Sequence, residues 1–172
     1  MATFTTSSYM LGTDLTANSA SFRDVVGKFL TGLDTIGLVN TNAYGAVTTA
    51  SAATIDPPNN ASDYRQFAVY RMNDTLQATA PVFIRFDFGG ETSFGRALGV
   101  KTKIGFTHNG SGSVGSTPNT TNPDSTAVCV GSTSGTIHPM YMCCISQSAF
   151  AIILNEDLTG VGTIVVERSL DA

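Results

Sequence analysis

An amphipathic helix pattern near the start of the chain, which nothing downstream repeats, places the strongest constraint on the fold. The spacing predicts a helix over residues 21–34, with Ser21 as N-cap, Asp24 as the acidic member of a capping box and Gly37 just past the last turn. One face of this helix is apolar and needs a sheet or a partner to cover it. That face consists of Phe22, Val25, Val26, Phe29, Leu30 and Leu33.

Short β-rich runs separated by polar turns make up most of the remaining chain. The strongest run is 81–89, in which Val82, Ile84, Phe86 and Phe88 alternate with Phe83, Arg85 and Asp87. Further strands are expected at 38–39, 66–72, 99–107, 126–130, 140–146, 150–155 and 162–169. The pattern predicts a mainly β fold: an antiparallel β-sandwich or barrel-like sheet of about seven to eight strands with one N-terminal amphipathic helix. We expect Phe67, Tyr70, Phe83, Phe86 and Phe88 to form a core layer.

The chain length of 172 residues fits a single β-rich domain over 1–172. Residues 1–18 are uncharged apart from Asp14 and rich in Thr and Ser, so we predict an extended N-terminal arm that is mobile in the monomer. Its apolar residues Phe4, Tyr9, Met10 and Leu11 would anchor it on another subunit, for example by adding a strand to a neighbour's sheet. Two long polar loops, 40–63 and 109–125, are expected to contact neighbours as well.

The composition favours a protein that is packed against other subunits. Only 13% of the residues are charged, about half the usual share, so Thr, Ser, Asn and Gly must supply the polar surface. A net charge of −4 argues against nucleic acid as the main ligand. Lys101 and Lys103 share one strand face, which favours a solvated edge-strand pair over a phosphate site. The sequence predicts no signal peptide and no membrane span.

The histidines and the glycine-rich segments predict no catalytic site. His108 and His138 have no neighbours at metal-ligand or catalytic-triad spacing. The segments 89–91 and 109–115 resemble phosphate loops only in their glycines, because neither ends in Gly-Lys-Ser/Thr or opens a helix.

The carboxylates give no stronger signal. Asp87 and Glu91 are interpreted as solvated groups rather than as an acid–base pair, and Asp56 and Asp124 lack the register of a calcium loop. We therefore expect no catalytic residue, no metal and no cofactor.

Three cysteines are too few for a disulfide framework. Cys143 and Cys144 are adjacent within an expected strand and so point to opposite faces, which favours free thiols that pack as small hydrophobes. A disulfide between Cys129 and one of them stays open as the alternative, in a particle that has left the cytosol.

Three segments resemble a loosely defined class of small tailed-bacteriophage virion proteins. They are the helix Ser21-Phe-Arg-Asp-Val-Val-Gly-Lys-Phe-Leu-Thr-Gly-Leu33, the stretch from Tyr70-Arg-Met-Asn-Asp-Thr-Leu-Gln77 to Phe-Asp-Phe-Gly89, and the stretch from Phe150-Ala-Ile-Ile-Leu154 to Val165-Val-Glu-Arg-Ser-Leu-Asp171. The resemblance implies a non-enzymatic structural subunit of a bacteriophage virion, made in the host cytoplasm. It would assemble in many copies, with itself and with other virion proteins. The class brings no catalytic residues, and tail, neck, baseplate and capsid surface all stay open as its location.

A binding module of a spike or fibre, which recognises a receptor or a host-surface glycan, is the alternative. Such a module would expose aromatic side chains around 44–63 or 109–137, where the sequence offers Tyr44 and Tyr64. A small hydrolase for cell-wall entry is the third hypothesis.

Overall fold

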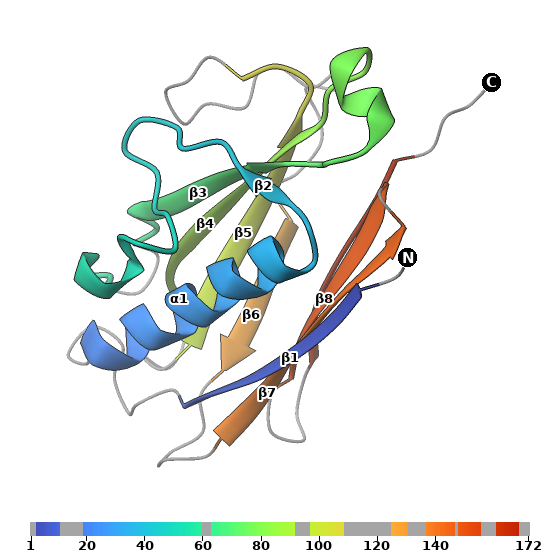
Figure 1. Cartoon of the computed structure of the whole chain (residues 1–172). Helices are drawn as coiled ribbons and strands as arrows, with labels where there is room; N and C mark the ends of the chain where they lie inside the picture. Colours follow the sequence, from blue (N-terminus) through green and yellow to red (C-terminus); the bar gives the residue numbers. More distant parts are fainter. Residues whose placement is uncertain are drawn as a thin grey trace.

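Two antiparallel β-sheets and one α-helix form the described part of the chain, which confirms the prediction of a mainly β fold with a single helix (Figure 1). The computed structural model describes residues 3–10, 19–59, 63–91, 97–108, 125–130, 137–146, 148–155 and 161–168.

The strands within these ranges separate into a four-stranded and a five-stranded sheet. The four-stranded sheet has the order β1-β7-β8-β9, and the five-stranded sheet has the order β2-β3-β4-β5-β6, with every neighbouring pair antiparallel. Their bounds are β1 Thr3–Met10, β2 Val39–Asn40, β3 Gln66–Arg71, β4 Phe83–Glu91, β5 Ala97–Gly105, β6 Ser125–Val130, β7 Ile137–Ser146, β8 Ala149–Asn155 and β9 Val161–Glu167. All eight predicted strands are present, and β1 is the strand that the pattern did not reveal.

Helix α1 spans Ser19–Thr35, and all six residues of its predicted apolar face are fully buried. The predicted N-cap is wrong, because Ser21 lies inside the first turn, and Asp24 pairs with Lys28 one turn later instead of closing a capping box. The predicted C-terminal stop is confirmed. Gly37 has a φ of 96°, and the Leu38 amide donates to the Leu33 carbonyl at 3.1 Å, as in a Schellman motif.

The helix packs against both sheets and joins them in one core (Figure 1). Phe29 makes edge-to-face contacts with Phe86 and Phe88 of β4, each with 5.3 Å between ring centroids. On the other side, a Cβ atom at Gly32 would overlap the sulfur of Met142 on β7, so the helix approaches the four-stranded sheet too closely for a larger residue without movement of Met142.

The predicted alternation of β4 is confirmed, but the predicted aromatic layer is only partly correct. Tyr70, Phe86 and Phe88 are fully buried in the core. Phe67 and Phe83 lie on the outer face of the five-stranded sheet instead, because β3 and β4 pair with Phe67 opposite Asp87 and with Phe83 opposite Arg71. Period-2 alternation assigns both of them to the face opposite to Phe86.

The N-terminal arm is part of the fold, which corrects the prediction that it lies free of the domain. Residues 3–10 form β1, which pairs with β7 in the register Phe4 opposite Cys143 and Thr6 opposite Tyr141. The arm therefore adds a strand to the sheet of its own chain rather than to that of a neighbour. Residues 11–18, with the expected anchor Leu11, lie outside the described residues.

The first long loop also packs on its own chain. Ala43, Val47, Ala52 and Ile55 are buried, and Ala52 lies in a short 3₁₀-helix, η1 (Ala52–Thr54), next to α1. The loop thus covers one edge of the core, which its polar composition did not reveal. Residues 60–62 of this loop and residues 109–124 of the second loop lie outside the described ranges.

Candidate interaction surface

The outer face of the four-stranded sheet carries two rows of uncharged side chains across all four strands. Met142, Ile152 and Ile164 are buried in the core, so the residues on either side of each in the sequence lie on the outer face. The strand registers align these outer residues into two rows, which together we call the two-row face. The first row is Phe4, Cys143, Ala151 and Val165, and the second row is Thr6, Tyr141, Ile153 and Thr163.

Large apolar side chains of this face are open to solvent. Phe4 is 63% exposed, Val165 is 62% exposed and Ile153 is 38% exposed. Phe4 stacks on Tyr141 with 6.2 Å between ring centroids, so the two rings form one aromatic patch. Burying such side chains is favourable by about 25 cal/mol per Å² of apolar surface, so leaving them in water forgoes that stabilisation.

The two-row face contains no charged residue, and its footprint lies just below that of the largest apolar patches on typical single chains. Four strands about 4.8 Å apart and two rows about 6.6 Å apart give a footprint of roughly 250 Å². The first charged residue after Val165 on β9 is Glu167, which lies beyond the first row. Contiguous apolar patches of a few hundred Å² on a single chain often mark interaction sites.

The outer face of the five-stranded sheet is different, because its charges already have partners. The Arg85 guanidinium lies 4.2 Å from the centre of the Phe67 ring, and its Nε donates to the Asp87 carboxylate at 2.8 Å. Lys101 Nζ lies 4.0 Å from the centre of the Tyr64 ring. These contacts hold the Arg85 and Lys101 side chains against aromatic rings, so the two cations are engaged within the chain.

The segment around Asp63 closes this outer face at one end. A Cβ atom at Gly89 would overlap the Asp63 carbonyl, so the segment crosses β4 at a position where a larger residue would not fit without movement of its backbone. The Asn59 amide donates to the Asp63 carboxylate at 2.7 Å, and together with Arg65 it lowers the pKa of that carboxyl below its ordinary value.

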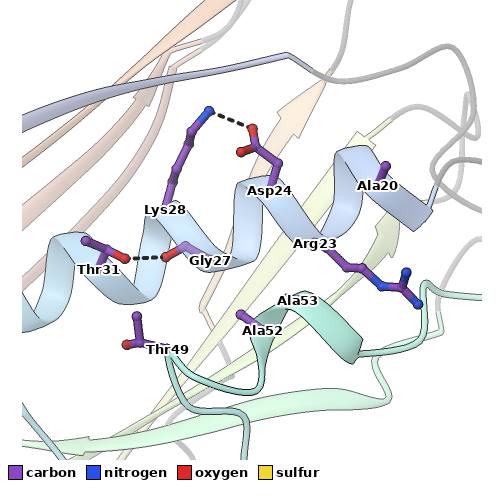
Figure 2. A pocket seen from close by; sticks show the side chains of 9 residues that line it. All are labelled: Ala20, Arg23, Asp24, Gly27, Lys28, Thr31, Thr49, Ala52 and Ala53. Atoms are coloured by element: carbon purple, nitrogen blue, oxygen red, sulfur yellow. Dashed lines mark hydrogen bonds and ion pairs between the residues drawn. The ribbon is translucent and has the colours of Figure 1, made fainter.

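An open groove of about 500 Å³ separates the solvent side of α1 from the 49–53 segment (Figure 2). Its charged side chains are held by the protein itself: Lys28 pairs with Asp24 at 2.6 Å, and Arg23 Nε donates to the Ile55 carbonyl at 2.7 Å. The rest of the lining consists of small or hydroxyl residues, Ala20, Gly27, Thr31, Thr49, Ala52 and Ala53. With its charges engaged, the groove offers little to orient a ligand.

A buried ion pair ties the two sheets together. Arg168, just after β9, pairs with Asp74 at 2.9 Å and donates to Gln77 Oε1 at 3.0 Å; each charged side chain is 5% exposed. Asp74 precedes the 3₁₀-helix η2 (Thr75–Ala78) in the β3–β4 connection. Two of the segments that carry the virion-protein resemblance, 70–89 and 150–171, therefore meet in this pair. Its burial indicates a structural role.

The structure scatters the candidate catalytic residues. His108 stacks on Phe83 at 5.3 Å between ring centroids, Asp87 is paired with Arg85, and Asp56 is exposed on the first loop. His138 lies in β7 opposite Tyr9. The side chains of His138 and Glu91, and the whole of Asp124, lie outside the described part of the chain. The expectation of an edge-strand lysine pair is wrong, because β5, which carries Lys101 and Lys103, lies between β4 and β6.

The cysteines follow the favoured interpretation where their side chains are described. Neither Cys143 nor Cys144 forms a disulfide. Cys144 packs against the core, whereas Cys143 lies on the two-row face. The Cys129 side chain lies outside the described residues.

Within the described ranges, no group of three His, Cys, Asp or Glu side chains could hold a metal ion. No helix there is long and apolar enough to cross a membrane. Comparisons with protein-family models, with curated proteins and with solved structures found no match.

Of the residues in the two-row face, the sequence pointed to Phe4, as an anchor of the arm, and to Cys143, as an unbridged thiol. A signal for the others was present, because Ala151–Leu154 and Ile164–Val166 are continuous apolar runs rather than alternating ones. Such runs indicate strands with apolar residues on both faces.

Proposed function

We propose that the protein is a non-enzymatic structural subunit of a bacteriophage virion that assembles in many copies. In this proposal the two sheets form a β-sandwich, and the helix packs between them along one side. The rigid domain presents its four-stranded sheet to neighbouring subunits.

The two-row face is the observation that carries the proposal. An uncharged sheet face on which Phe4 and Val165 are more than half exposed is suited to contact with other protein subunits rather than to catalysis. The N-terminal arm contributes to this face through Phe4 and Thr6. The arm would therefore contribute to assembly as a strand of its own chain's sheet, not as a strand added to a neighbour's sheet.

The low share of charged residues agrees with this proposal. At 13% charged residues, the chain has little charge repulsion to keep copies apart at high local concentration. The three segments resemble small tailed-phage virion proteins, and we therefore propose that the copies are arranged in a phage particle.

The described residues support the receptor-binding alternative less well. Tyr44 is 88% exposed, but Tyr64 is covered by Lys101, so the two expected rings do not form one platform. Reproducible binding of the isolated protein on a glycan array would favour this alternative.

Mass spectrometry of particles purified from the lysed host tests the proposal directly. We expect the chain at many copies per particle, in a constant ratio to other virion proteins through successive gradient purifications. Loss of the chain during purification, or its absence from the particles, would refute the proposal.

A further inference from the structure

The two-row face alternates large and small side chains in a pattern that complements a copy of itself. Each of the four strands contributes one larger and one smaller residue to the face, and the contrast is smallest on β9, where Val165 and Thr163 have equal numbers of side-chain heavy atoms. The pairs are Phe4 and Thr6, Tyr141 and Cys143, Ile153 and Ala151, and Val165 and Thr163. In the first row the large residues stand at the two ends, and in the second row they stand in the middle.

One two-fold rotation places every large residue opposite a small one. Its axis lies in the plane of the interface, runs across the strands and passes between the rows, so that the first row of one copy covers the second row of the other. Tyr141 then faces Cys143 of the other copy, and Ile153 faces Ala151. A two-fold axis parallel to the strands would instead place Cys143 against Ala151 and leave a hollow at the centre. Close packing of protein interfaces favours the first arrangement.

The electrostatics of the face fit a second copy better than a charged partner. A face without charge gives an acidic or basic partner no group to pair with, whereas a second copy presents an equally uncharged surface. Each chain carries a net charge of −4, so two copies repel weakly at long range, and added salt screens that repulsion.

We propose that the two-row face is a two-fold interface between copies of this chain, with row one of each copy on row two of the other; this inference rests on the proposed function. The whole outer face, four strands of about seven residues, has a footprint of roughly 440 Å². This is below the roughly 800 Å² per partner of a stable complex, so an isolated pair is weak. The many contacts of an assembled particle would strengthen it.

Sedimentation equilibrium of the full chain, from about 10 μM to about 1 mM, tests the interface. We expect a reversible monomer–dimer equilibrium that shifts toward dimer with added salt. Val165→Lys places a charge in the first row and should weaken the dimer at least about tenfold, a loss of about 1.4 kcal/mol. Tyr44→Lys makes the same kind of change at an exposed aromatic outside the face and should leave the equilibrium unchanged. Thermal melts confirm that both variants are folded.

A size swap on β8 tests the row-on-row geometry. Ala151→Ile alone should weaken the dimer, because two large side chains would then meet at Ile153 of the other copy. The double variant Ala151→Ile with Ile153→Ala should restore it, because a large residue again faces a small one. If the double variant stays as weak as the single one, or if Val165→Lys does not weaken the dimer, the proposed interface is wrong.

The outcome is separable from that of the proposed function. A chain that is found in the particles but stays monomeric up to about 1 mM overturns the self-association and leaves the structural role intact. A chain that dimerises through this face but is absent from the particles refutes the role and keeps the interface.

Discussion

The buried pair between Arg168 and Asp74 allows a quantitative test of how the two sheets are held together. The pair links the end of β9 in one sheet to the β3–β4 connection of the other, and Gln77 supports it by accepting from Arg168 and from the Val82 amide. Asp74 Oδ2 and Arg168 Nε are buried without hydrogen-bond partners. The contact between the charges therefore has to offset most of their desolvation.

Removal of one charge should cost far more than removal of both. Arg168→Met leaves the 5%-exposed Asp74 carboxylate without its ion-pair partner, which typically costs about 3–5 kcal/mol in the free energy of unfolding. The double variant Asp74→Leu/Arg168→Met leaves no buried charge and should lie within about 1 kcal/mol of the original protein. With Asp74→Leu as the second single variant, the cost of the double variant minus the sum of the two single costs is the coupling energy of the double-mutant cycle.

Guanidinium chloride unfolding followed by circular dichroism measures these free energies. Arg65→Met is the matched control: Arg65 pairs with Asp63 at 2.6 Å, but its side chain is 34% exposed, so its loss should cost less than about 1 kcal/mol. If Arg168→Met costs no more than this control, the pair is effectively solvated and does not hold the sheets together. Additive single-variant costs in the cycle would lead to the same conclusion.

Three further substitutions probe the core. Phe29→Ala should cost about 3–5 kcal/mol in denaturant melts, because the fully buried ring contacts Phe86 and Phe88; a loss below about 1 kcal/mol would show that this helix face is exposed. Thr102→Val should raise the free energy of unfolding by about 1 kcal/mol in the same melts, because the Thr102 hydroxyl is buried without a hydrogen-bond partner; a loss would show that it has one. Burial raises the pKa of Tyr70 above its ordinary value of about 10, so the unfolded chain loses this proton first and stability should fall by up to about 1.4 kcal/mol per pH unit above pH 10. In melts across that range Tyr70→Phe should flatten the fall, and an unchanged slope would contradict the assignment.

The helix and the strands could be predicted because local pattern decides them. The apolar spacing of α1 and the alternation of β4 both follow from a helical or strand period against one buried face. The start of the helix was missed because the apolar spacing begins only at Phe22, whereas the helix already begins at Ser19, before the first apolar residue of that face. The assignment of Phe67 and Phe83 to the core was wrong because it relied on their aromatic character. The strand period places both on the face opposite to Phe86.

The N-terminal arm and the first loop show where local pattern fails. Neither segment holds enough apolar residues to predict its order, yet β1 gains a full ladder of backbone hydrogen bonds from β7, and the loop adds four apolar side chains to a core made by other elements. Such stabilisation comes from residues far away in the sequence. Similarly, no spacing rule connects Asp74 to Arg168, 94 residues apart.

The two-row face shows why the candidate site was harder to predict than the fold. In β8, Ile152 faces the core and Ile153 faces solvent, yet both read as the same apolar run. A period of two identifies which residues share a face, but not whether that face is buried by the same chain or left for another. Only the positions of α1 and the second sheet show that the inner face is already covered. An uncharged outer face with exposed apolar side chains is the feature that an assembling subunit would need, and the strand period alone does not distinguish it from the covered inner face.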